Sequence, residues 1–197
     1  MAGMKKLTLG FIGNGKSTNR YHLPFVLQRK DKLAVKTIYQ RNLAKQEWER
    51  LPGVNYTDDL EALLSDKEIQ AIVITTPIEA HYEMIRKVLE AGKHCVCEKP
   101  FLATSAEARE MFDLAKAKGL MLQCYQNRRF DSDFLTLQKV IESGKLGDIL
   151  EVENTYDYYR PYVPEGAAAF DKLNSYLYDT ISSNRVSFTF PMLDAVC

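Results

Sequence analysis

Short hydrophobic runs alternate with segments of helical periodicity along the first 125 residues of the chain. The runs are rich in β-branched and aromatic residues, which favour strands, and they are too short for buried helices. A repeated order of strand, helix and strand is the pattern of a parallel sheet covered on both faces. The predicted strands are Leu7–Ile12, Leu33–Tyr39, Val54–Tyr56, Ala71–Thr75, His94–Cys97 and Met121–Tyr125.

Capping residues mark the ends of the predicted helices. Thr57 precedes two aspartates and predicts a helix N-cap, and the sequence TSAE from Thr104 to Glu107 predicts a capping box. Glycine adopts the left-handed conformation at low cost, so it commonly follows the last turn of a helix. On this basis one helix runs from about Glu79 to Gly92, another stops at Gly119, and a third begins near Asp131 and stops at Gly144.

The pattern changes near residue 148. Ile149–Tyr158 alternates apolar and polar residues, which is typical of a half-exposed antiparallel strand. Six of the 11 tyrosines lie between Tyr156 and Tyr178, and Ser182–Cys197 has no clear period. The sequence therefore predicts an α/β domain with a doubly wound parallel sheet over residues 1–125. Residues 126–197 are predicted to form a bridging helix and the start of an incomplete α+β domain, mostly antiparallel.

The composition excludes several classes of protein. The 197 residues carry 26 Lys plus Arg and 26 Asp plus Glu, so no basic excess favours nucleic acid or an anionic membrane. No apolar run approaches the ~20 residues of a membrane-spanning helix, and early glycines interrupt any signal sequence. Four cysteines are too few for a disulfide scaffold, and Cys95 and Cys97 on one strand face fit a reducing compartment. We expect a cytoplasmic protein without a metal site.

A glycine-rich loop follows the first predicted strand. Residues 13–18 read GNGKST and fit the G-x-G-x-x-(G/A) pattern of dinucleotide-binding loops, with Thr18 at the third position. In that pattern Gly13 permits a tight turn, and Gly15 lets the backbone approach a pyrophosphate. Thr18 is larger than Gly or Ala and predicts slightly looser packing of the helix on the strand. A glycine turn without a ligand is the plain alternative.

The same stretch also fits the phosphate-binding P-loop, G-x-x-x-x-G-K-S, through Gly10, Gly15, Lys16 and Ser17. That interpretation requires the loop to begin at Gly10, although the next two residues look like the end of a strand. It also needs a second apolar strand that ends in Asp, and no carboxylate follows Ala71–Thr75. A P-loop nucleotide hydrolase is the third hypothesis.

The end of the second predicted strand bears on the choice of cofactor. An Asp or Glu there would bind the ribose 2′-hydroxyl of NAD. The strand is instead followed by Gln40, Arg41 and Asn42, and Arg41 is suited to a 2′-phosphate. This favours NADP slightly over NAD, whereas a solvated loop charge is the alternative for Arg41.

Lys99 directly follows another predicted strand, between Glu98 and Pro100. Doubly wound folds bind ligands at the carboxyl ends of their strands, where a partly desolvated lysine is suited to proton transfer. Pro100 favours an extended conformation of Lys99, which aims its side chain away from the strand end. An exposed lysine in a turn commonly serves solubility alone, and the spacing leaves both interpretations open.

The order of these motifs closely resembles the Gfo/Idh/MocA oxidoreductase family. The resemblance covers roughly residues 5 to 160, and its most specific part is the segment that ends in Glu98-Lys99-Pro100. It implies a Rossmann domain, an open antiparallel second domain, and NAD(P)-dependent oxidation or reduction of a secondary alcohol or ketone of a sugar, inositol or polyol. The matching segments are Gly10–Gly15, Ile72–Pro77 with His81, Ala91–Pro100, Gln126–Phe130 and Gly144–Ile149.

The resemblance also implies roles for individual residues. Lys99 and Glu98 are the expected catalytic residues beside the nicotinamide, where Lys99 touches the reacting oxygen and Glu98 also contacts the cofactor. Arg128 is expected to help hold cofactor or substrate, and His81, if not a cofactor contact, satisfies local backbone groups. The pyrophosphate contacts are Gly13, Gly15, Lys16 and Ser17, and the contacts on the nicotinamide-ribose side are Thr75, Thr76, Pro77 and His81; further substrate contacts are expected at Tyr158, Arg160 and Asp179.

The resemblance weakens after residue 160. Similar enzymes place an Asp and a His soon after the first strand of the second domain, whereas residues 168–185 contain no histidine and no glycine. The nearest carboxylates are Asp171 and Asp179, and family members are nearly twice as long as this chain. A non-catalytic dinucleotide-binding module is therefore the second hypothesis, and a homo-oligomer is expected where the second domain is complete.

Overall fold

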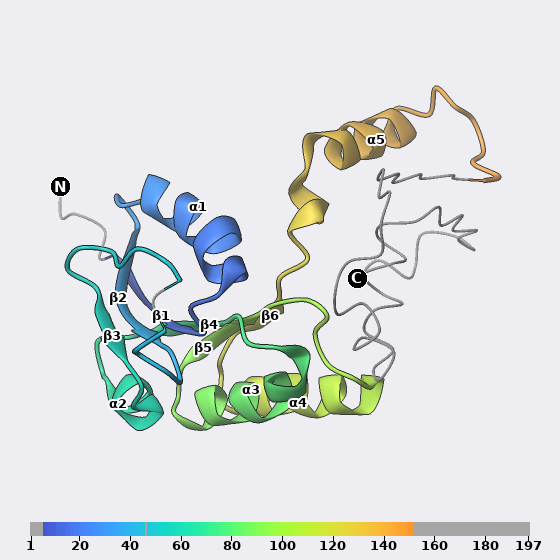
Figure 1. Ribbon diagram of the computed structural model, residues 1–197. Coiled ribbons are helices and arrows are strands. Elements are labelled where there is room, and N and C mark those ends of the chain that lie inside the picture. Colours follow the sequence, from blue (N-terminus) through green and yellow to red (C-terminus); the bar gives the residue numbers. More distant parts are fainter. Residues whose placement is uncertain (1–5, 46, 152–197) are drawn as a thin grey trace, which may run out of the picture. The chain divides into compact units, whose positions relative to one another are not determined.

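A six-stranded parallel sheet forms the centre of the computed structural model, with the strand order β3-β2-β1-β4-β5-β6 (Figure 1). The structure describes residues 6–45 and 47–151. The strand order runs outward from β1 to β3 and then from β4 to β6 on the other side, which is the doubly wound Rossmann topology. The predicted fold class is confirmed. The strands are β1 (Leu7–Ile12), β2 (Leu33–Tyr39), β3 (Asn55–Thr57), β4 (Ala71–Ile74), β5 (His94–Cys97) and β6 (Leu122–Cys124).

Helices cover both faces of this sheet (Figure 1). The segment after β1 covers one face, and the helices that follow β3, β4 and β5 cover the other. On the first face lie the π-helix η1 (Ser17–His22) and α1 (Leu23–Gln28). On the second lie α2 (Leu60–Ser65), the 3-10 turn η2 (Ile78–Ala80), α3 (His81–Glu90) and α4 (Ser105–Ala117).

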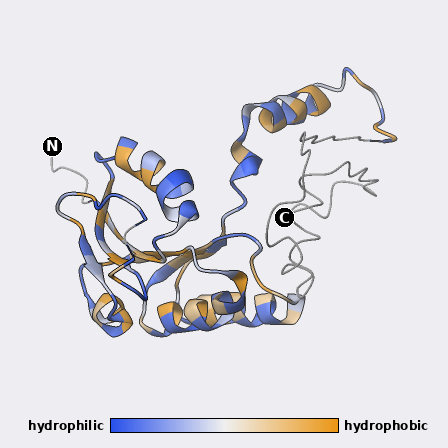
Figure 2. Cartoon of the chain, viewed as in Figure 1, coloured by the Kyte–Doolittle hydropathy of each residue, from blue (hydrophilic) through white to orange (hydrophobic). Residues whose placement is uncertain are grey.

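Each face of the sheet has its own hydrophobic core, because neighbouring residues of a strand point to opposite sides. Phe11 of β1 packs with Leu23 of α1 in one core. Ile72 and Ile74 of β4 pack with Ile85 of α3 in the other. Figure 2 shows hydrophobic and hydrophilic residues side by side along α1, α3 and α4, as expected of helices that bury one stripe.

The predicted strands agree closely with the structure. The first, second and fifth strands have the predicted bounds at both ends. The other three differ by one residue at one or both ends, since Asn55–Thr57, Ala71–Ile74 and Leu122–Cys124 are observed. The strand β4 is an apolar run that is buried throughout, as expected inside a parallel sheet, and the other strands were located by short β-rich segments between the helix signals.

The predicted N-cap at Thr57 is wrong. The helix α2 begins at Leu60, and Asp59 caps it by accepting a hydrogen bond from the backbone N–H of Ala62 at 3.0 Å. Thr57 is still part of β3, where it pairs with Tyr39. Its hydroxyl accepts a hydrogen bond from the backbone N–H of Asp59, so the strand extends to the residue that looked like the start of the helix.

The other helix signals are confirmed. Thr104 and Glu107 form the capping box of α4. The segment predicted to be helical from Glu79 begins as the 3-10 turn η2 and becomes α-helical at His81. Glycines with positive φ follow α3, α4 and the later helix α5 (Ser132–Glu142), namely Gly92, Gly119 and Gly144.

The chain divides into two units, Met1–Tyr125 and Gln126–Cys197. In the second, the 3-10 turn η3 (Asn127–Phe130) precedes the helix α5 (Ser132–Glu142). Of the strand predicted over residues 149–158, residues 149–151 lie in no strand, and residues 152–158 lie outside the described residues, as does the rest of the predicted second domain. Among the described residues, no helix combines the length and apolar character needed to cross a bilayer.

Candidate functional site

The candidate site lies at the carboxyl ends of β1, β4 and β5, which are adjacent strands of the sheet. The first residue after β4 is hydrogen-bonded to the last residue of β1, and the first residue after β5 is hydrogen-bonded to the last residue of β4. The backbone N–H of Thr75 donates to the carbonyl oxygen of Ile12 at 2.9 Å, and that of Glu98 donates to the carbonyl oxygen of Ile74 at 3.0 Å. The loops after these strands therefore begin side by side, where doubly wound sheets bind ligands.

The P-loop interpretation is wrong. Gly10 lies inside β1, where it pairs with Thr37 of β2 and with Ile72 of β4. A strand residue between two paired neighbours cannot begin a loop that wraps a phosphate, so the loop begins three residues later, at Gly13.

The two loop glycines occupy different surroundings. Gly13 has a φ of +115°, and a Cβ there would lie 2.5 Å from Thr75 Oγ1, so only glycine fits. A Cβ at Gly15 would meet nothing within 4 Å. The backbone at Gly15 is open to the approach of a ligand, which fits the part that the second glycine plays beside a pyrophosphate.

Thr18 closes the base of the loop. It is fully buried, and its hydroxyl contacts the carbonyl oxygen of Gly13 at 2.8 Å and Thr75 Oγ1 at 2.7 Å. The extra size of Thr18, compared with Gly or Ala, is thus used for hydrogen bonds between the loops after β1 and β4.

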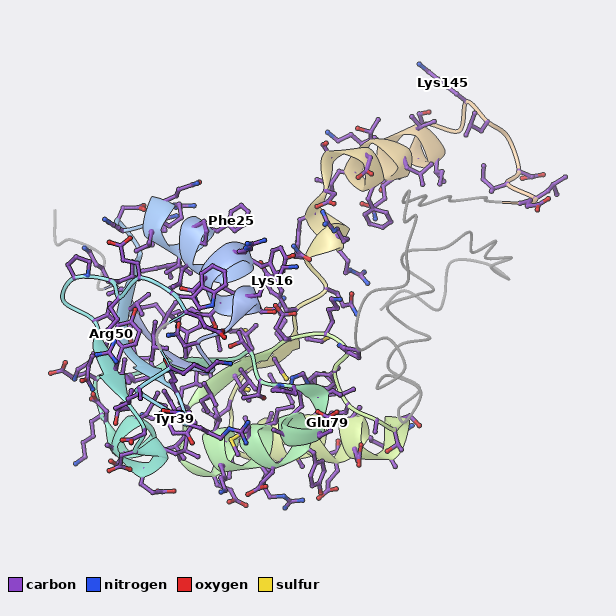
Figure 3. The ribbon with its side chains drawn as sticks, in the orientation of Figure 1. Lys16, Phe25, Tyr39, Arg50, Glu79 and Lys145 are labelled. Carbon is purple, nitrogen blue, oxygen red and sulfur yellow. The ribbon has the colours of Figure 1, made fainter. Side chains whose placement is uncertain are left out.

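The loop leads into a π-helix. In η1 the backbone N–H of Leu23 donates to the carbonyl oxygen of Thr18, five residues earlier. Lys16 and Ser17 lie at the start of this segment, and Figure 3 labels Lys16 there. The four-residue spacing of Thr18 and His22 places both side chains on the buried face of η1.

Asn14 and Gln40 connect the glycine loop to the end of β2. The side-chain amide of Asn14 donates to Gln40 Oε1 at 2.7 Å. The Gln40 amide in turn donates to the backbone carbonyl oxygens of Asn42 and Lys45. Arg41 lies beside this network and is exposed to solvent. Sequence reasoning missed Asn14 and noted Gln40 only as the residue that replaces an acid.

The residues after β4 that are expected to contact the nicotinamide ribose differ in their surroundings. Pro77 is exposed, whereas Thr75 Oγ1 is engaged with the carbonyl oxygens of Ile12 and Gly13. Thr76 Oγ1 is a buried hydroxyl for which the described residues supply no hydrogen-bond partner. A buried hydroxyl without a partner is uncommon in folded proteins, and at this sheet edge it fits a polar group of a ligand.

His81 is 1% exposed and contacts three backbone carbonyl oxygens. Its Nε2 lies 2.9 Å from the oxygen of Thr76, and its Nδ1 lies 3.0 Å from those of Pro100 and Phe101. These contacts match the alternative in which His81 satisfies backbone groups. The ring joins the loop after β4 to the loop after β5.

Glu98 and Lys99 differ in exposure. Glu98 is buried, whereas Lys99 is exposed. Glu98 Oε1 lies 2.9 Å from Nε2 of His22, and Glu98 Oε2 accepts a hydrogen bond from the backbone N–H of Lys99 at 3.0 Å. Sequence reasoning missed His22, because nothing in the local pattern pairs residues 22 and 98.

The remaining predicted contacts lie in the second unit. Arg128 is exposed and pairs with Asp131, with Nη1 2.9 Å from Oδ2. Tyr158, Arg160 and Asp179 lie outside the described residues. Within the described part of the chain, no group of three or more His, Cys, Asp or Glu side chains is placed to hold a metal ion.

The sequence that forms this sheet and its loops matches a known protein family. Residues 7–126, more than half of the chain, match the model of the Gfo/Idh/MocA oxidoreductase family with an NAD-binding Rossmann fold. The chain belongs to this family. The resemblance drawn from the motifs is confirmed.

Individual relatives agree with this assignment. The uncharacterized oxidoreductase YhhX of Escherichia coli is 50% identical over 156 residues, which are 79% of this chain and 45% of YhhX. The scyllo-inositol 2-dehydrogenase (NADP(+)) IolW of Bacillus subtilis is 35% identical over 157 residues, which are 80% of this chain and 43% of IolW. The chain spans less than half the length of these two relatives.

A solved structure shows the same fold. The crystal structure of YhhX matches with a TM-score of 0.76 and 48% identity, over 89% of this chain and 53% of the YhhX chain. The Rossmann sheet of the Gfo/Idh/MocA family therefore accounts for the described first unit.

Proposed function

We propose that this chain is an NAD(P)-dependent oxidoreductase that acts on a secondary alcohol or ketone of a sugar, inositol or similar polyol. The observation that carries the proposal is the position of Lys99. It is exposed at the carboxyl end of β5, at the same sheet edge as the open backbone of Gly15 and the hydroxyl of Thr76, which has no hydrogen-bond partner among the described residues.

The residues at this edge fit a dinucleotide. The backbone of Gly13 and Gly15 would hold the pyrophosphate together with Lys16 and Ser17. Thr76 would offer its hydroxyl on the nicotinamide-ribose side, while the hydroxyl of Thr75 keeps the two loops together. When bound, the nicotinamide supplies hydride transfer to or from the carbinol carbon of the substrate.

Lys99 is the catalytic residue of this proposal. Its ammonium or amine group moves the proton of the reacting hydroxyl, which is the acid–base part of alcohol oxidation. Glu98 supports it from the buried side by accepting the hydrogen bond of the Lys99 backbone N–H. Arg128 and the substrate contacts Tyr158, Arg160 and Asp179 stay proposals on the resemblance alone.

NADP is the slightly favoured cofactor. Gln40 stands at the end of β2 where an NAD-selective site carries an acid, and its amide is committed to the glycine loop and to the next backbone turn. This leaves the exposed Arg41 as the charged group beside the adenosine ribose, where it is suited to a 2′-phosphate. The name of the relative IolW also specifies NADP(+).

The test combines binding with turnover. Titration of the 197-residue chain with NADPH and NADH, followed by energy transfer from Trp48, gives both affinities, because Trp48 is the only tryptophan and lies against Arg20 of η1. A panel of sugars and inositols then tests for oxidation coupled to cofactor reduction, both in this chain and in the chain extended by the second domain of a relative. Absence of binding to either cofactor would overturn the proposal.

A second candidate is a non-catalytic dinucleotide-binding module. It is favoured by residues 168–185, which contain no histidine where the resemblance places one. Cofactor binding without turnover of any polyol, even after extension with the second domain of a relative, would support the module.

A further inference from the structure

We propose that His22 is a positioning residue, whose hydrogen bond to Glu98 ties the helical segment after the glycine loop to Lys99. This inference rests on the proposed function, because it assigns to the His22–Glu98 pair the task of shaping the nicotinamide side of the dinucleotide site. It concerns contacts within the first unit alone.

The first link is between the glycine loop and His22. His22 is the last residue of η1, which begins two residues after Gly15. Thr18, four residues before His22, holds the start of this segment against Gly13 and Thr75. A ligand at the open backbone of Gly15 would therefore lie two residues before the short element that carries His22.

The second link is the fixed orientation of the imidazole ring. The ring stands edge-on to Phe11, with centroids 6.1 Å apart and planes at 70°. Its other neighbour is Tyr125, with centroids 4.1 Å apart. The Tyr125 hydroxyl donates to the backbone carbonyl oxygen of Tyr21 at 3.1 Å, which joins the end of β6 to η1. Packing against these two rings restrains the orientation of the His22 imidazole.

The third link is the carboxylate. Nε2 of His22 lies 2.9 Å from Glu98 Oε1, and the two side chains are 6% and 8% exposed. A carboxylate accepts hydrogen bonds and does not donate them, so Nε2 carries the proton of this contact. The other oxygen, Oε2, accepts from the backbone N–H of Lys99. Both oxygens of Glu98 are thus used to fix the strand end from which Lys99 projects.

A buried carboxylate that loses one hydrogen-bond partner is left poorly solvated, and this costs free energy. The side chains around it are then expected to rearrange. Loss of His22 would free Oε1 and release the strand end at Lys99, while the Asn14–Gln40 network would keep the adenosine side in place. The contact therefore predicts a selective effect on the nicotinamide half of the cofactor.

Calorimetric titration of the full chain with NADPH and with 2′,5′-ADP, the adenosine half alone, tests this. For His22→Ala we expect the dissociation constant of NADPH to rise about tenfold, as for loss of one hydrogen bond to a charged group, and that of 2′,5′-ADP to change less than about twofold. His22→Gln keeps an N–H donor at a similar reach and should recover most of the affinity. Glu98→Gln can satisfy only one of the two donors, so it should weaken NADPH selectively as well.

Val88→Ala is the matched control, since Val88 is fully buried in α3 on the other face of the sheet. It should lower the melting temperature and leave both dissociation constants unchanged. Equal losses for NADPH and 2′,5′-ADP in His22→Ala, or no loss for either, would overturn the inference. If His22→Ala does not fold, an unselective Glu98→Gln would overturn it equally. Failure of the wild-type chain to bind either ligand would instead refute the proposed function.

Discussion

At the residue scale, neighbouring side chains of the site differ sharply in environment. Glu98 is buried with both carboxylate oxygens hydrogen-bonded inside the protein, whereas the next residue, Lys99, is exposed. The strand β5 ends at Cys97, so Glu98 and Lys99 belong to the loop that follows it, in which the first residue is buried and the second is exposed. The division suits a site in which a buried acid fixes the backbone and an exposed base meets the substrate.

Lys99→Ala should abolish most hydride transfer without unfolding the protein. In any form of the protein that oxidises a polyol, we expect kcat to fall ~10²-fold or more, as loss of a proton-transfer group commonly does. Cofactor affinity should change little, because the proposed pyrophosphate contacts lie elsewhere. Steady-state kinetics beside the exposed control Lys118→Ala checks this, and unchanged turnover in Lys99→Ala would show that the lysine is not catalytic.

Arg41→Ala should change cofactor preference. If Arg41 binds a 2′-phosphate, its loss weakens NADPH by about 10-fold, as for one charge-assisted hydrogen bond, and leaves NADH unaffected. Trp48 energy transfer measures both affinities, and Arg109→Ala, an exposed arginine on α4, serves as the control. A clear preference of the wild-type chain for NADH, unaltered by Arg41→Ala, would contradict the assignment of NADP.

At the scale of elements, the sequence predicted what depends on local pattern and missed what depends on tertiary contact. The strands were predictable as short β-rich segments between the helix signals, and the capping box of α4 because its two residues are three apart. Thr57 misled because a threonine before acidic residues fits both a cap and a strand end. The π-helix η1 and the His22–Glu98 contact were missed, since residues 76 positions apart meet only through the fold.

The turn at Gly13 should tolerate no side chain. Gly13 and Gly53 both have positive φ, so alanine at either position costs ~1 kcal/mol of stability. A Cβ at Gly13 would also collide with Thr75, whereas a Cβ at Gly53 would meet nothing within 4 Å. We therefore expect Gly13→Ala to lower the free energy of unfolding by about 1–3 kcal/mol more than Gly53→Ala does. Urea denaturation of the two variants measures this difference. Equal losses of unfolding free energy would show that Gly13 does not lie against Thr75.

The ion pair between Lys36 of β2 and Asp66 at the end of α2 should make the free energy of unfolding depend on pH in the acid range. Lys36 Nζ lies 2.7 Å from Asp66 Oδ2, and this hydrogen bond, helped by the backbone N–H of Glu68, holds the pKa of Asp66 below its usual 3.8. A carboxyl whose pKa is lower in the folded protein stabilises it above the unfolded pKa, and this contribution disappears as the pH falls through the folded pKa. Between about pH 5 and about pH 2, wild-type stability should therefore fall more steeply than that of Asp66→Asn, and less so at high salt.

Urea denaturation across this pH range measures the difference, with the exposed Asp113→Asn as the control. Parallel curves for the wild type and Asp66→Asn would mean that the contact with Lys36 contributes nothing to the acid dependence.

At the scale of the whole molecule, binding of cofactor and turnover of substrate make different demands on the chain. The first unit holds the sheet edge with the glycine loop, Thr76 and Lys99. Hydride transfer also requires a carbinol carbon held within ~3–3.5 Å of the nicotinamide, and this positioning supplies several kcal/mol of the rate. The matched part of the chain covers 45% of YhhX and 43% of IolW, and residues 168–185 contain no histidine.

We therefore expect the 197-residue chain, tested alone, to bind a dinucleotide but to turn over polyols very poorly. Lys99 can exchange a proton with a bound hydroxyl, but a single exposed lysine does not orient a polyol against the nicotinamide. The measurement compares kcat/KM of this chain with that of the chain extended by the complete second domain of a relative, against the same sugars and inositols. The extended form should be faster by orders of magnitude, and Lys99→Ala should remove the gain. If the short chain matches the extended one, then residues such as Asp171 or Asp179 supply the positioning, and the requirement for a further domain is wrong.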